Sequence, residues 1–492
     1  MTGHLAPRPV RRWGPPIAMA AAFLSACAYP TRNEALTDPA QTRYDYQQAR
    51  AADGMPDTLV IVTASGGGAR ATALALSALQ AMDEIKLRSG ASTLARQVDI
   101  VSSVSGGSVA AAYFALNGPG KLDLLKQNFL QKDVMTTLEV QGLNPVGLAT
   151  LSTPAVERID LLIDYLSRDK VFGKTTFDAL LDGRDHPYLI LNAADMVEGT
   201  PFSFTQYTLD LLCSDLSKVR IATAVAASAA FPVALSPVTL KNYSTAGHSC
   251  DPDSTAWVQT ALETDWAQDP GRVSRGRAAQ AYLTGAKSYV HLLDGGIADN
   301  LGVAEPLRLL TTEDDLSSDF PEQIVSGQIR KLVFVMINAR SAKPSELDHA
   351  PDTPGAISML TASIYAPIDR AAAGGAYQAR TLIRERLAGW ANQAERAGTP
   401  QIAKRLRALA DQAKFVPVEL DAIGEDDCRQ TMQTIPTSWT LSAQQLDATL
   451  RMGRALFLDN AGEILATIGG STTAPLRGNV DAVCRSLQNV SW

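Results

Sequence analysis

Short β-branched runs, Gly-rich turns and longer apolar segments alternate along the first part of the chain. Residues 59–62 form an apolar run that leads into three glycines and then an Ala/Leu-rich segment through Met82. Residues 98–101 begin a second unit of the same kind, with a Ser-Gly-Gly turn and an apolar segment over 109–116. Because strands that alternate with helices build parallel sheets covered on both faces, the pattern predicts an α/β fold with a mostly parallel sheet.

Three more apolar runs, at 188–192, 289–293 and 332–338, predict further strands and place the main folded body at 57–340. The stretch 355–415 is rich in Ala, Arg and Leu at helical spacing. This spacing predicts that residues 341–492 form a mainly helical C-terminal extension packed on that body. The apolar face of this helical stretch, flanked by Arg380, Arg384 and Arg386, either packs on the body or lies on a membrane surface. The polar, Trp-containing stretch 243–285 predicts an insertion, which we interpret as a candidate lid.

The N-terminus has the order of an export signal. Three arginines between residues 8 and 12 precede an apolar run over 17–26, which is short for a bilayer span. The run ends in Leu24-Ser25-Ala26-Cys27, which resembles the lipobox of bacterial lipoproteins. That resemblance implies removal of 1–26, diacylation of Cys27, a tether over 27–56 and, because Ala28 follows, anchoring in the outer membrane facing the periplasm. The alternative is an ordinary secretory signal with Cys27 nearby by chance.

The other cysteines are Cys213, Cys250, Cys428 and Cys484, an even number that an exported chain uses for disulfides. Four cysteines allow three pairings, and we expect near neighbours to pair, Cys213 with Cys250 and Cys428 with Cys484. Their separations match no zinc spacing and the five histidines are scattered. We therefore expect neither a metal nor a cofactor.

Composition and charge exclude one class of partner. The chain is 46% apolar and 19% charged, which is typical of a globular protein, and its net charge of -7 is mild for 492 residues. Nucleic-acid binding needs a strongly basic face, so we expect no nucleic-acid partner.

Candidate chemistry begins with the turn Ser103-Val104-Ser105-Gly106-Gly107. A strand that turns sharply into a helix needs small residues, and the turn lifts one hydroxyl clear of the sheet beside the positive end of the helix. Ser105 occupies that position, which makes it a candidate nucleophile. A purely structural turn is the simpler interpretation when this motif is taken alone.

The triple-glycine turn, Gly66-Gly67-Gly68, precedes Ala69 and Arg70. Such glycines free backbone N–H groups to point at one anionic atom. The Lys and Ser/Thr of a phosphate-binding loop are absent, and the spacing does not fit a dinucleotide fingerprint. An oxyanion hole for acyl transfer is the remaining use, with Arg70 either binding substrate or orienting the loop.

The third motif is Asp294-Gly295-Gly296, at the end of the strand predicted at 289–293. A carboxylate at that edge of the sheet can accept the proton of a serine directly. An Asp-Gly-Gly sequence alone indicates only a turn. The interpretation of Asp294 as a base therefore depends on the presence of the other two motifs.

In this order the three motifs resemble those of the patatin-like phospholipase family, in its bacterial lipoprotein branch. The family has a Gly-Gly-Gly-x-Arg/Lys loop, a Gly-x-Ser-x-Gly elbow and an Asp-Gly-Gly/Ala turn, and residues 227–232 also look like its Ala-Ser-x-Ala-x-Pro segment. The resemblance covers about 58–340. Ser103 stands where the elbow begins with Gly, and Ala71 stands where Gly often follows the loop Arg.

The resemblance implies a three-layer fold and a lipid acyl hydrolase acting on membrane lipids or lipid esters. Ser105 would attack the ester and Asp294 would take its proton. The turn Gly66-Gly67-Gly68 would form the oxyanion hole, with the amides of Gly67 and Gly68 holding the oxyanion. An acyltransferase on a related fold and a catalytically silent lipid-binding lipoprotein are the alternatives. The lipid class and the oligomeric state do not follow from the sequence.

A Ser-His-Asp triad is the competing constellation for a serine hydrolase. Only His349 follows Asp294, in a Pro-rich stretch, which argues against the usual order of an α/β-hydrolase. His291 lies three residues before Asp294, and in a strand it faces the opposite side of the sheet. We therefore expect a structural role for His291.

Overall fold

The computed structural model describes residues 31–37, 43–50, 56–87, 92–143, 157–184, 186–232, 234–244, 255–267, 269–312, 319–341, 351, 353–468, 478–488 and 490. The export signal with Cys27, and also Cys250 and His349, lie outside the described residues. Among the described residues, no helix combines the length and the apolar character that a membrane span needs.

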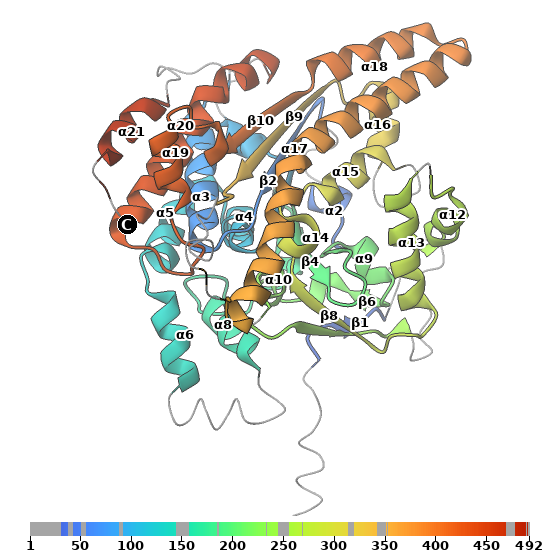
Figure 1. Ribbon diagram of the computed structural model, residues 1–492. Helices are drawn as coiled ribbons and strands as arrows, with labels where there is room; N and C mark the ends of the chain where they lie inside the picture. The colour runs from blue at the N-terminus through green and yellow to red at the C-terminus, as the bar shows by residue number, and fades with distance from the viewer. Residues whose placement is uncertain are drawn as a thin grey trace, which may run out of the picture.

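An eight-stranded sheet forms the centre of the molecule (Figure 1). Five neighbouring strands are parallel: β10 (Lys414–Glu419), β9 (Lys331–Asn338), β2 (Thr58–Ala64), β3 (Ile100–Val104) and β4 (Tyr188–Asp195). The other three run antiparallel to their neighbours: β8 (Tyr289–Asp294), β7 (Val238–Lys241) and β5 (Pro201–Ser203). The prediction of an α/β fold with a mostly parallel central sheet is confirmed.

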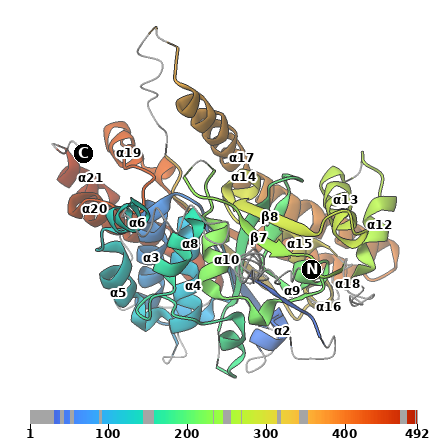
Figure 2. The same ribbon diagram turned by 90° about the horizontal axis from the view of Figure 1, so that it is seen from below.

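Helices cover both faces of the sheet, giving three layers (Figures 1 and 2). On one side α3 (Gly68–Glu84) packs between α4 (Gly106–Asn117) and α20 (Ala443–Ile468). On the other side α15 (Ala304–Thr311), α16 (Phe320–Ser326) and the antiparallel pair α17 (Ala356–Arg396) and α18 (Pro400–Gln412) pack together. Because both faces are covered, β2 and β3 are buried along almost their whole length, which is why they read as continuous apolar runs.

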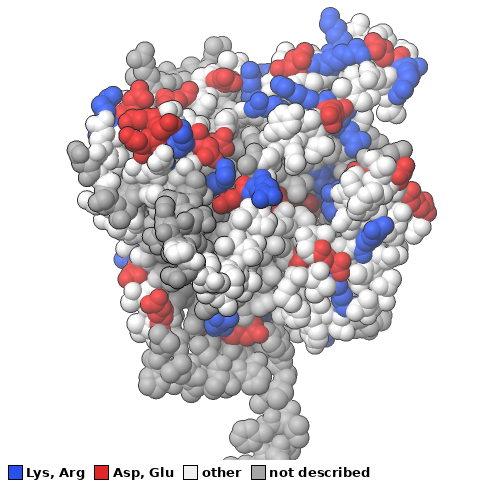
Figure 3. Space-filling view, in the orientation of Figure 1, with Lys and Arg blue, Asp and Glu red and all other residues white. Residues whose placement is uncertain are grey.

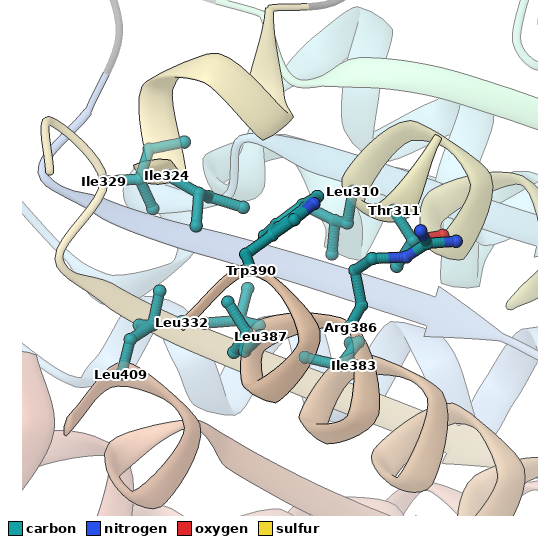
Figure 4. A pocket seen from close by; sticks show the side chains of 10 residues that line it. All are labelled: Leu310, Thr311, Ile324, Ile329, Leu332, Ile383, Arg386, Leu387, Trp390 and Leu409. Atoms are coloured by element: carbon teal, nitrogen blue, oxygen red, sulfur yellow. The ribbon is translucent and has the colours of Figure 1, made fainter. Parts of the chain in front are cut away.

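The second half of α17 packs its apolar face on the body. Figure 4 shows Ile383, Leu387 and Trp390 of this helix facing Leu332 of β9 and Leu310 of α15 around a small apolar cavity. The cavity measures about 10 Å³, which is no more than a single water occupies. Arg380, Arg384 and Arg386, which flank this apolar face, are exposed. Of the two interpretations of this helix, packing is therefore the one that the structure supports.

The segment after residue 340 packs on the body and also adds a strand to the central sheet. Its strand β10 continues the central sheet beside β9, in register from Lys414 opposite Val333. The strand is short and contains Pro417, which an edge strand tolerates because one of its sides has no ladder to complete. Its helix α20 packs along α3 on the face of the sheet.

The structure joins Cys428 of α19 (Asp426–Gln433) to Cys484 of α21 (Val480–Leu487) through a disulfide, the pair expected from the sequence. Cys213 is also disulfide-bonded. A pairing with Cys250 stays a prediction, because Cys250 is outside the described residues.

Candidate active site

Ser105 lies in a strained turn between β3 and α4. Its backbone has φ 51° and ψ -122°, a region that residues with a side chain rarely adopt. The following residue must be glycine, since a Cβ on Gly106 would lie 2.0 Å from the carbonyl oxygen of Gly68. The turn therefore brings the N-termini of α3 and α4 together, with the Ser105 side chain at the positive end of α4.

Ser228, the last residue of α10 (Ile221–Ser228), holds this turn in place. The backbone N–H of Ser105 donates to its hydroxyl oxygen at 2.8 Å, and that hydroxyl donates to the carbonyl of Asn192 at 2.6 Å. The Ser228 carbonyl in turn accepts the N–H of Gly295 at 3.1 Å. One residue of the family-like segment 227–232 thus connects the serine turn with the aspartate turn.

Asp294 ends β8 and is buried beside Ser105. The N–H of Gly296 donates to its carboxyl group at 2.8 Å, and the Ser105 side chain lies close to the same group. Burial raises the pKa of Asp294 to about 6, although the Gly296 N–H and the Ser105 hydroxyl favour the ionised form and oppose the shift. At neutral pH the carboxylate is therefore ionised and within reach of the serine proton, with a pKa suited to accept and return it.

The triple-glycine turn leads into α3, and its amides differ in availability. Gly66 donates its N–H to the carbonyl of Asn300 at 3.2 Å, so the protein itself engages this amide. Among the described residues the N–H groups of Gly67 and Gly68 have no acceptor. A Cβ on Gly68 would lie 2.4 Å from the carbonyl oxygen of Ser438, so only glycine fits there. Two amides at the start of a helix are thus available for an anionic oxygen.

Arg70 is buried and its guanidinium binds the protein itself. Its Nε donates to the carbonyl of Ala339 at 3.0 Å, its Nη1 to the carbonyl of Ile435 and its Nη2 to the hydroxyl of Thr437 at 3.1 Å. Burial lowers the pKa of Arg70 to about 10, which still leaves it protonated at neutral pH. Of the two roles expected from the sequence, these contacts fit the orientation of the loop.

Ser105, Asp294 and the glycine turn open onto a cavity of about 230 Å³. Sequence reasoning missed most of its outer wall, which includes Tyr365, Ile368 and Asp369 of α17, together with Trp439. Tyr365 stacks on Phe231 with ring centroids 4.8 Å apart, which fixes α17 over the site. No motif marks these residues, because a helix that walls a cavity needs only the right shape and no particular chemistry.

The lid expected within 243–285 stays a prediction. None of its described residues lines the cavity at Ser105. Its two helices, α12 (Trp257–Glu263) and α13 (Pro270–Leu283), pack on each other and line a different cavity. The polar composition of the stretch indicated an exposed insertion, but it carried no information on which face of the body the insertion covers.

The histidines take no part in the described site. His291 accepts or donates a hydrogen bond with Thr239 of the neighbouring strand at 2.9 Å, which agrees with the structural role expected for it. His349 is outside the described residues. The described residues also contain no group of three His, Cys, Asp or Glu side chains arranged to hold a metal ion.

A family profile described as patatin-like phospholipase matches residues 62–307, which is half of the chain. Among solved structures, human GIVD cytosolic phospholipase A2 is similar at 13% identity and a TM-score of 0.44 over 86% of this chain. The same human protein in complex with methyl gamma-linolenyl fluorophosphonate is similar at 13% identity and a TM-score of 0.37 over 92%. The chain spans 64% of the length of that protein in each case. The comparison with curated protein sequences gives no match.

The contacts of Ser228 predict a positioning role that activity measurements can test. We expect Ser228→Ala to lower kcat for ester hydrolysis by about 10- to 100-fold with little change in KM. The substitution leaves the buried N–H of Ser105 without an acceptor at a strained residue, a loss of about 1–3 kcal/mol. Steady-state kinetics on a soluble p-nitrophenyl ester measures both constants.

Thr223→Val on the same helix is the matched control. The Thr223 hydroxyl is buried without a hydrogen-bond partner, so its removal should leave kcat and KM unchanged. Equal kcat values for Ser228→Ala and the wild type would show that the serine turn keeps its geometry without this hydroxyl.

Proposed function

Because the chain belongs to the patatin-like phospholipase family, we propose that it is a serine lipid acyl hydrolase with Ser105 and Asp294 as its catalytic dyad. The observation that carries the proposal is that Ser105, the buried Asp294 carboxyl and the turn of Gly67 and Gly68 line one cavity, with Ser105 close to Asp294. These three parts are what acyl transfer requires: a nucleophile, a base and donors for the developing negative charge.

In the first half of the reaction, the Ser105 oxygen attacks the ester carbonyl while its proton passes to Asp294. The carbonyl oxygen becomes an oxyanion that the N–H groups of Gly67 and Gly68 bind. When the tetrahedral intermediate collapses, the bond to the alcohol breaks and Asp294 returns the proton to the leaving oxygen. The acyl group is then an ester of Ser105.

In the second half a water molecule attacks this acyl-serine, with Asp294 again taking the proton. Collapse of the second intermediate releases a fatty acid and restores the Ser105 hydroxyl. A pKa near 6 suits both roles of Asp294, because the group is ionised at neutral pH yet holds a proton long enough to return it. No histidine is required in this scheme.

The first half of α17 supports a lipid surface as the place of action. This part of the helix reaches from the cavity wall outward and projects from the body (Figure 2). Its first 13 residues, 356–368, contain no charged side chain, and Met359 and Leu360 are 47% and 49% exposed. Figure 3 shows charged side chains over the far end of the α17–α18 pair and few over the lower half of α17.

Met359 and Leu360 precede the cavity-lining Tyr365 by five or six residues, which is about 8–9 Å along a helix. Insertion of these side chains into the lipid surface would place the mouth of the cavity at the level of the acyl esters.

We extend the proposal to a location in the cell envelope, with diacylated Cys27 as the membrane anchor. That part rests on residues 24–27 of the sequence alone.

A lipid panel tests the proposed activity and the nucleophile together. We expect the protein without 1–27 to release fatty acid from phospholipid or lysophospholipid, and Ser105→Ala to lower the rate at least 10⁴-fold because the nucleophile is lost. Mass spectrometry identifies the products. Ser363→Ala serves as the control, since this serine lies on α17 near the cavity and its hydroxyl donates only to the carbonyl of Met359.

Two outcomes of the panel would contradict the proposal. The first is release of fatty acid by Ser105→Ala at the wild-type rate. The second is transfer of the acyl group to an added alcohol or lysolipid faster than to water, which would identify an acyltransferase.

The role of α17 predicts a separation between lipid surfaces and dissolved substrates. We expect the double substitution Met359→Gln and Leu360→Gln to lower hydrolysis of phospholipid vesicles about tenfold or more. Loss of two half-exposed apolar side chains removes about 1–3 kcal/mol of transfer free energy. Hydrolysis of a dissolved short-chain ester should stay at the wild-type rate, because neither residue lines the cavity.

Leu382→Gln is the matched control, since Leu382 is 50% exposed on the same helix but about 33 Å from Leu360 along its axis. An equal loss on vesicles for Leu382→Gln, or an unchanged rate for the double variant, would contradict docking through the first half of α17.

A further inference from the structure

A second cavity lies on the side of the molecule that carries the antiparallel strands. It is formed by β5, α9 (Gln206–Asp210), α12, α13 and α15, and measures about 70 Å³. A cavity of this size holds several water-sized groups. It shares no lining residue with the cavity at Ser105. The proposed dyad therefore does not account for it.

Two arginines and one glutamate line this cavity. Arg308 makes a bidentate ion pair with Glu305, at 2.6 and 3.0 Å, and its guanidinium stacks 3.9 Å from the ring centre of Tyr207. Arg275 also lines the cavity, but among the described residues it has no hydrogen bond and no ion pair. Within the described lining, the single carboxylate is therefore engaged by Arg308 and not by Arg275.

Neither nearby carboxylate pairs with Arg275. Both oxygens of Glu305 accept from Arg308, and Asp269 caps α13 by accepting the N–H of Arg272 at 2.8 Å. Burial, and after it the charge of Arg308, lower the pKa of Arg275, while the charges of Asp269 and Glu305 oppose part of this shift. A half-buried cation beside a second cation is unfavourable unless an anion joins them.

Trp257 provides an independent sign of a missing acceptor in the same cavity. Its side chain lines the cavity, is 7% exposed and stacks on Tyr207 with ring centroids 5.2 Å apart. Its indole N–H is fully buried and has no hydrogen-bond partner among the described residues. Buried N–H groups nearly always have an acceptor, so this one calls for an oxygen that the described part of the chain does not supply.

We propose that this cavity is a binding site for a small organic anion, a carboxylate or phosphate monoester with a short apolar tail. Arg275 would bind the anionic head and the indole N–H of Trp257 would donate to one of its oxygens. The tail would lie on the apolar part of the lining, made of Phe202, Leu211 and Ala279. A free acyl carboxylate and a phosphorylated head group share this chemistry.

Isothermal titration calorimetry of the full chain with hexanoate and with hexyl phosphate tests the site and separates the two sources. We expect at least one of the two to bind, while hexanol, which has the same tail and no charge, does not. Arg275→Gln should weaken binding at least tenfold, because a charge-assisted hydrogen bond is lost. Trp257→Phe keeps the ring that stacks on Tyr207 and removes the N–H, and should also weaken binding.

Arg277→Gln is the matched control, because Arg277 lies on the same helix, is exposed and is not among the lining residues. It should leave binding unchanged. A second measurement excludes damage to the fold: without ligand, Arg275→Gln should unfold at the same temperature as the wild type or a higher one, since the substitution removes an unpaired cation. The stabilising effect of the anion on the wild type should be absent from this variant.

Three results would overturn the proposal: no binding of either anion, equal binding by Arg275→Gln and the wild type, or a lower unfolding temperature of Arg275→Gln without ligand. The last result would mean that Arg275 stabilises the fold through the protein alone. None of these measurements depends on the activity of Ser105.

Discussion

The left-handed turn at Ser105 is the constraint on which the rest of the site depends. A residue with a side chain at φ 51° costs about 1–3 kcal/mol, so the surrounding structure must hold it. The buried strand β3 fixes one end of the turn, the close approach of Gly106 to Gly68 fixes the other, and Ser228 holds the N–H between them. The same contacts align two helix N-termini, which is why the proposed nucleophile and the amides of Gly67 and Gly68 face one cavity.

The C-terminal third of the chain completes this arrangement from the outside. The Ser438 carbonyl lies over Gly68 and accepts the N–H of Ala69 at 2.7 Å, while Arg70 reaches Ile435 and Thr437. Strand β10 and helix α20 hold that segment against β9 and α3. The geometry of the glycine turn therefore depends on residues more than 360 positions away, and a boundary near residue 340 does not divide two independent units.

The apolar pattern was sufficient to predict β2, β3, β4, β8 and β9. All of these except β8 are buried along almost their whole length, and strands covered on both faces must be apolar along their length. The motif order was sufficient to predict that Ser105, Asp294 and the glycine turn lie together. Three features could not be predicted from the sequence. These are the hydrogen bond from the Gly66 N–H to the Asn300 carbonyl, the hydrogen bond from the Ser105 N–H to Ser228, and the position of α17 along the cavity at Ser105. Those features depend on which backbone groups meet in three dimensions, whereas periodicity reports only burial.

Burial of the Asp294 carboxylate lowers the stability of the fold at neutral pH, while it gives the group the pKa that the proposed reaction needs. Its folded pKa of about 6 lies above its unfolded value, so the free energy of unfolding falls as pH rises toward 6, by at most about 3 kcal/mol.

The most direct test of the dyad is the pH dependence of the rate at which a fluorophosphonate labels Ser105. The account predicts a rate that is half-maximal near pH 6 in the wild type, and a slow, pH-independent rate in Asp294→Asn. A flat profile in the wild type, or equally fast labelling of Asp294→Asn, would contradict it.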